Sequence, residues 1–152
     1  MNILVNILVK ILRGLKAKSP ANLKAKQDIQ KLLAIPFEEV KRRALAMLSD
    51  RTRFRCVVAR DPTSSVGENM GPVLRDFFSH FDSVVELNGE FSVGRLLIGD
   101  SSLRSGFLKI GSDFAFSELV IRPGEDQIYI VTDSEHELDG LPTIYHIIYL
   151  LE

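Results

Sequence analysis

The sequence predicts an α+β fold: a mostly antiparallel sheet of about five or six strands flanked by helices, with a helical extension at the N-terminus. Three observations predict it. Apolar residues recur with a helical period in the first third of the chain and again near its end. Short apolar runs bounded by turn-forming residues fill the middle. Successive strands joined by short turns pair antiparallel, and helices placed before and after them are typical of the α+β class.

The N-terminal segment, residues 1–15, predicts a basic amphipathic helix. Leu4, Leu8 and Ile11 share one face, and Lys10 interrupts the apolar run. The segment is too short and too interrupted to span a membrane, and it has no cleavage site typical of a signal peptide. We expect the helix to dock on its own domain or on a second copy of the chain, which would give a homodimer. Binding along a membrane surface is the less favoured alternative.

Two further helices and a strand follow in the basic part of the chain. Ser19-Pro20 forms a helix start, and the second helix runs to about Ala34. Pro36 opens the third helix, whose first turn carries two glutamates that suit the helix dipole. An apolar run at residues 54–59 then predicts the first strand.

A loop rich in turn formers, residues 61–71, marks a change in charge. Residues 1–60 hold fourteen Lys and Arg against four acids, whereas residues 61–152 hold five against sixteen. The sequence therefore predicts a basic helical extension at 1–60, ending in the first strand, and an acidic α+β core at 61–152. The two parts can form one compact domain. The total charge of −1 hides this strongly dipolar distribution.

The acidic part predicts a regular succession of elements. A helix begins at Pro72, and Asn88-Gly89 and Pro123-Gly124 predict tight turns. An acidic loop at 134–140 precedes a closing helix at 142–151. Strands are expected at residues 84–87, 91–98, 107–111, 117–122 and 127–132.

No catalytic motif accompanies this pattern, and we expect no enzyme activity, cofactor or metal. The sequence contains no glycine-rich phosphate loop and no nucleophile elbow. Its single cysteine, Cys56, excludes an internal disulfide and indicates a reducing, cytoplasmic compartment. Two alternatives stay open. The carboxylates and the imidazole of residues 133–139 can hold a divalent cation, although the glycine of a calcium loop is missing. Cys56 can pair with one of the histidines His80, His136 and His146.

Six segments in the second half of the chain carry a resemblance to a known family. They are Pro72–Phe78, the hairpin at Asn88-Gly89, the strand and turn at Gly106–Asp113, the strands Glu118–Ile121 and Gln127–Asp133, and the closing helix Thr143–Leu151. In these segments the chain resembles the SUKH superfamily, which includes fungal cell-wall-synthesis regulators and many bacterial immunity proteins. The similarity implies protein binding without catalytic residues; in many bacterial members this binding neutralises a toxin domain.

The charge distribution is compatible with that implication. Many such toxins are nucleases with basic clefts, which an acidic surface can occupy after rapid, electrostatically steered association. We therefore expect a basic protein partner. The predicted binding residues are Glu118, Asp133, Glu135, Glu137 and Asp139. In the alternative function, the basic helices around Lys41-Arg42-Arg43 contact nucleic acid. We favour it less, because charge runs on helices are usually solvated.

Overall fold

The computed structural model of the 152-residue chain describes residue 27 and residues 30–60, 70–87, 91–113, 118–131 and 137–151. The predicted amphipathic helix at residues 1–15 and the predicted helix start at Ser19-Pro20 lie outside these ranges. Residues 30–34 are helical, as predicted for the end of the second helix.

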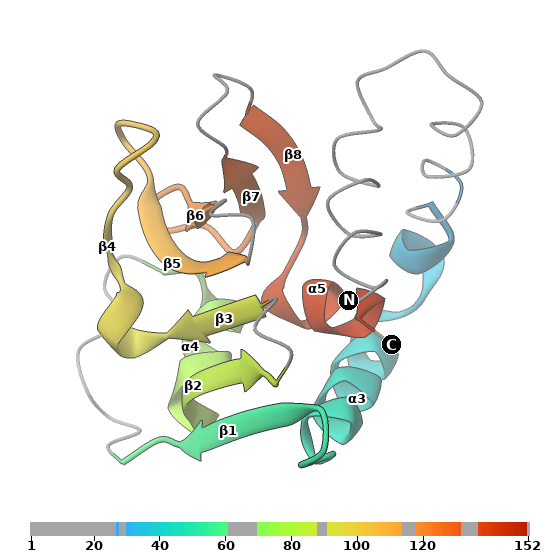
Figure 1. The fold of residues 1–152 in the computed structure, drawn as a ribbon. Coiled ribbons are helices and arrows are strands. Elements are labelled where there is room, and N and C mark those ends of the chain that lie inside the picture. The colour runs from blue at the N-terminus through green and yellow to red at the C-terminus, as the bar shows by residue number, and fades with distance from the viewer. Residues whose placement is uncertain are drawn as a thin grey trace.

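The described elements confirm an α+β fold (Figure 1). In chain order they are α3 (Phe37–Leu48), β1 (Phe54–Val58), α4 (Pro72–His80), β2 (Phe81–Glu86), β3 (Phe91–Gly94), the 3-10 helix η2 (Arg95–Leu97), β4 (Gly99–Asp100), β5 (Leu108–Asp113), β6 (Glu118–Ile121), β7 (Ile128–Val131), β8 (Glu137–Leu141) and α5 (Ile144–Leu150).

All neighbouring strands pair antiparallel, in the order β1-β2-β3-β5-β6-β7-β8, and the short β4 also pairs with β5. The described residues thus form eight strands, two more than the sequence indicates. The additional strands are β4 and β8. The prediction of a loop at 134–140 is wrong from Glu137 onward, because β8 pairs with β7 through Val131↔Glu137 and Ile130↔Leu138.

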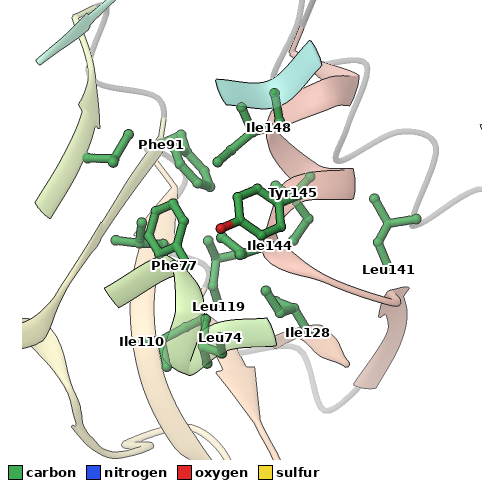
Figure 2. Packing of buried hydrophobic residues seen from close by; sticks show 14 of the residues in the cluster. Leu74, Phe77, Phe91, Ile110, Leu119, Ile128, Leu141, Ile144, Tyr145 and Ile148 are labelled. Carbon is green, nitrogen blue, oxygen red and sulfur yellow. The ribbon is translucent and has the colours of Figure 1, made fainter. Parts of the chain in front are cut away.

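Helices α3, α4 and α5 contribute to one core on one face of the sheet. Leu119 and Ile121 of β6 point into this core, and the buried Phe77 of α4 and Tyr145 of α5 meet edge to face with their ring centroids 5.8 Å apart. Figure 2 shows these rings among the aliphatic side chains of the central strands.

The basic part of the chain shares this core. Val40, Ala44 and Leu48 of α3 and Phe54 of β1 are at most 5% exposed and belong to the same cluster as Tyr145. The charge sign changes near residue 61, but the core continues across that point.

Gly111 shows how closely two strands approach. The similarity to SUKH proteins predicts it in a turn after a strand, but it lies inside β5, opposite Val93 of β3. A side chain at this position would overlap the carbonyl oxygen of Ser92 and approach Val93 Cγ1 to 2.7 Å. Glycine is needed here because β3 and β5 pack tightly.

A second, smaller apolar cluster lies on the opposite face of β6 and β7. Phe107, Val120, Tyr129 and Val131 form it, and all are buried. The guanidinium of Arg122 lies 5.6 Å from the ring of Phe107 and 5.3 Å from that of Tyr129, a cation–π arrangement. Loop and sheet are therefore packed together on this face as well.

Within the described part of the chain, no helix has the length and apolar character needed to cross a membrane.

Candidate functional site

The acidic residues predicted for binding separate into two groups in the structure. Glu137 and Asp139 lie in β8, which ends the sheet next to β7 (Figure 1). Asp133 and Glu135 lie outside the described residues, immediately before β8 in the sequence. The four acids therefore belong to one continuous segment that leads into the last strand of the sheet.

Glu118, in contrast, does not belong to an exposed binding surface. It is 4% exposed, and its carboxylate accepts hydrogen bonds from Ser101 Oγ at 2.5 Å and Ser102 Oγ at 2.8 Å. The Leu103 amide also donates to it, and Lys109 Nζ lies 3.8 Å away. We therefore remove Glu118 from the predicted binding residues: its charge holds the 101–103 turn against β6.

The electrostatics of Glu118 fit this structural role. Burial by itself would raise the pKa of its carboxyl, but hydrogen bonds from Ser101, Ser102 and nearby backbone amides outweigh that effect. The pKa of Glu118 is therefore lowered, and the side chain is held as a carboxylate.

Other acids of the C-terminal half are also engaged inside the molecule. Asp126 accepts a hydrogen bond from the Leu74 amide at 2.9 Å, in the first turn of α4. Asp82 lies 3.5 Å from Arg95, and Glu86 is buried at 4% exposure. Several of the acids counted in the sequence are thus used to hold the fold together. The densest group of the others is the run at 133–139, which carries four acids within seven residues.

The basic residues of α3 are engaged in a similar way. Lys41 Nζ lies 2.8 Å from Asp76 Oδ2, and Arg43 lies 3.1 Å from Glu39 and donates to Tyr149 Oη at 3.0 Å. These contacts direct much of the basic run at 41–43 toward other helices. They weaken the nucleic-acid alternative, which needs these charges on a free surface.

The opposite edge of the sheet is basic. Residues 51–60 contain four arginines and no acid, and the edge strand β1 lies among them. A concavity of about 500 Å³ runs along this edge beside the end of α3. Its lining includes the apolar side chains of Leu48, Phe54, Val58 and Leu87, together with the arginines Arg51 and Arg55.

A titratable cluster that the sequence does not indicate joins the three helices. Asp76 Oδ2 of α4 accepts a hydrogen bond from Tyr145 Oη of α5 at 2.8 Å, and Lys41 of α3 approaches the same oxygen. His80 Nε2 lies 3.5 Å from Asp76 Oδ1. Only the i,i+4 spacing of Asp76 and His80 is visible in the sequence, because the other two members lie on distant helices.

The remaining nucleophile and base candidates lie in separate environments. His146 is 6% exposed, and its Nδ1 lies 2.7 Å from Thr143 Oγ1 at the start of α5; burial lowers its pKa. Cys56 is half-buried, with its Sγ 3.5 Å from the Leu48 carbonyl oxygen, and burial raises its pKa. His136 lies outside the described residues. Among the residues that the structure describes, no group of three or more His, Cys, Asp or Glu is placed to hold a metal ion.

No family model, curated protein or solved structure matches this chain.

Proposed function

We propose that this chain is a non-enzymatic protein-binding domain of the immunity type, which neutralises a basic toxin domain such as a nuclease. The single observation that supports the proposal most strongly is the position of the acidic segment: Glu137 and Asp139 lie on a strand at the edge of the sheet. An edge strand offers backbone donors and acceptors to a partner, and adjacent carboxylates attract a basic surface. The similarity of residues 71–151 to SUKH proteins points to the same class.

The charges on this edge favour fast association more than high affinity. Carboxylates around a binding surface accelerate encounter with a basic cleft, and this acceleration falls as salt rises. Backbone pairing along β8 would then fix the orientation of the partner. The proposed complex therefore combines a salt-dependent association rate with a dissociation rate set by contacts at the strand.

The test looks for a toxin-like domain among the reading frames that neighbour this chain on its chromosome, and it uses that domain as the binding probe. We expect the chain to protect cells that express this domain, and the variant Glu137→Lys/Asp139→Lys to weaken binding at least about tenfold. The matched control Asp100→Lys/Glu125→Lys changes two exposed acids elsewhere and should protect as well as the native chain. Absence of protection together with absence of binding at low salt contradicts the proposal.

A further inference from the structure

The two outermost strands of the described sheet carry opposite charges and have the same length. β1 (Phe54–Val58) and β8 (Glu137–Leu141) each contain five residues and lie at opposite ends of the strand order (Figure 1). Arginines follow one another through and around β1, whereas β8 carries Glu137 and Asp139. Each strand has a single neighbour among the described strands.

The register of β1 shows which backbone groups face outward. The Leu87 amide donates to the Arg53 carbonyl oxygen at 2.8 Å, and Arg55 lies opposite Val85 of β2. In an antiparallel pair, alternate residues direct their backbone groups to the same neighbour. Arg53 and Arg55 therefore bond toward β2, and the amide and carbonyl of Cys56, the residue after Arg55, face away from β2.

Apolar side chains accompany this edge. Val58 is 73% exposed and Leu87 is 44% exposed, and both line the concavity that runs beside β1. A further strand placed along β1 would cover these side chains and supply partners for the outward backbone groups. The edge thus offers backbone, apolar and charged contacts to an extended segment.

Charge selects between the ways in which two copies can pair their edges. Pairing β1 with β1 brings Arg55 of one copy near Arg55 of the other. Pairing β8 with β8 brings the acids Glu137 and Asp139 of the two copies together. Like charges directly opposite each other are destabilising. Pairing β1 with β8 brings opposite charges together. We infer that the acidic strand β8 of one copy pairs with the basic edge β1 of a second copy, so that the sheet continues from molecule to molecule.

Two properties of the assembly follow from its geometry. Five-residue strands bury little surface, so the interface belongs to the weak, transient class. The contact is heterologous, and it generates open chains of copies unless the rotation happens to close a ring. This inference requires only the two edges and is independent of the proposed function. If both hold, a basic partner and a second copy compete for β8.

Sedimentation velocity over a concentration series tests the inference. We expect the full chain to self-associate at about 20 mM salt and to become monomeric at about 500 mM, where charges are screened within a few ångströms. The variants Arg55→Glu and Glu137→Arg/Asp139→Arg each place like charges on both edges, and each should weaken association at least about tenfold. The control Arg75→Glu makes the same charge change on the exposed surface of α4 and should associate like the native chain.

Mixing the two edge variants gives the decisive readout. In the mixture, the altered β1 of one variant meets the altered β8 of the other with opposite charge, so we expect association to return. This return also shows that both variants are folded. A monomeric native chain at low salt overturns the inference, as does association that Arg55→Glu leaves unchanged or a mixture that stays monomeric.

Discussion

At the scale of single residues, Glu118 shows how an acid of an acidic sequence can serve the fold. Its carboxylate is saturated by two serine hydroxyls and a backbone amide from residues 101–103. These donors lie fifteen to seventeen positions earlier in the chain, and no local pattern connects them to β6. The sequence predicts an exposed binding residue because it shows the charge and not the donors that reach it.

The first prediction concerns the loss of this charge. We expect Glu118→Gln to lower the free energy of unfolding by about 1–3 kcal/mol, because buried hydrogen bonds to a charged group are worth more than neutral ones. Urea denaturation at neutral pH measures the change. The control Glu125→Gln alters an exposed acid in the turn before β7 and should stay within about 0.5 kcal/mol of the native chain. Equal stability of both variants would show that Glu118 is not a structural carboxylate.

At the scale of elements, one carboxylate connects three helices. Asp76 of α4 receives Lys41 of α3 and Tyr145 of α5 on the same oxygen, each at 2.8 Å. Burial would raise the pKa of Asp76, but the hydrogen bonds from Lys41 and Tyr145, together with the charges of Lys41 and His80, lower it below its ordinary value of 3.8. In turn, burial and the Asp76 carboxylate raise the pKa of Tyr145, which stays a hydrogen-bond donor.

The second prediction is a dependence of stability on pH. Because the pKa of Asp76 is lower in the folded state, its contribution is present above the unfolded value near 3.8 and is lost as pH falls through the folded value. We expect Asp76→Asn to cost about 1 kcal/mol at pH 7, a figure reduced by solvent screening because the Asp76 side chain is 36% exposed. The cost should shrink toward zero at a pH below the folded value, where the native carboxyl is also neutral.

Urea melts of Asp76→Asn and the native chain at both pH values give this comparison. Asp100→Asn, in the exposed strand β4, is the matched control and should show no such change. A cost that is the same at both pH values would mean that Asp76 acts through its shape and not through its charge.

The success of the sequence predictions also differs between elements. The turn at Pro123-Gly124 is confirmed by the positive φ of Gly124, +85°, and α3 and α4 begin within a residue of their predicted prolines. β8 is missed because Glu, Asp and Gly are depleted in strands. Its pairing with β7 comes from backbone bonds that any residue can make. Residue propensity identifies an element whose own side chains favour it. It misses a strand that forms because a neighbouring strand pairs with its backbone.

At the scale of the whole molecule, charge and packing divide the chain differently. The basic and acidic halves meet near residue 61, and on charge alone they resemble two units. The core contradicts such a division, because Val40, Leu48 and Phe54 are buried with residues of the acidic half. Charge pattern describes what a surface attracts, whereas burial decides which segments fold together. The sequence therefore shows the charge difference between the two halves clearly. It shows their shared core only indirectly, through the spacing of apolar residues.

The third prediction follows from that shared core. Burying Val40, Leu48 and Phe54 is worth about 5–9 kcal/mol, comparable to the whole stability of a typical domain. We therefore expect a fragment of residues 61–152 to remain unfolded alone, because removing α3 and β1 exposes this core and leaves β2 with only one of its two neighbouring strands. Circular dichroism and urea denaturation of the fragment, beside the full chain, provide the measurement. A cooperative unfolding transition in the fragment would show that the acidic half is an autonomous domain.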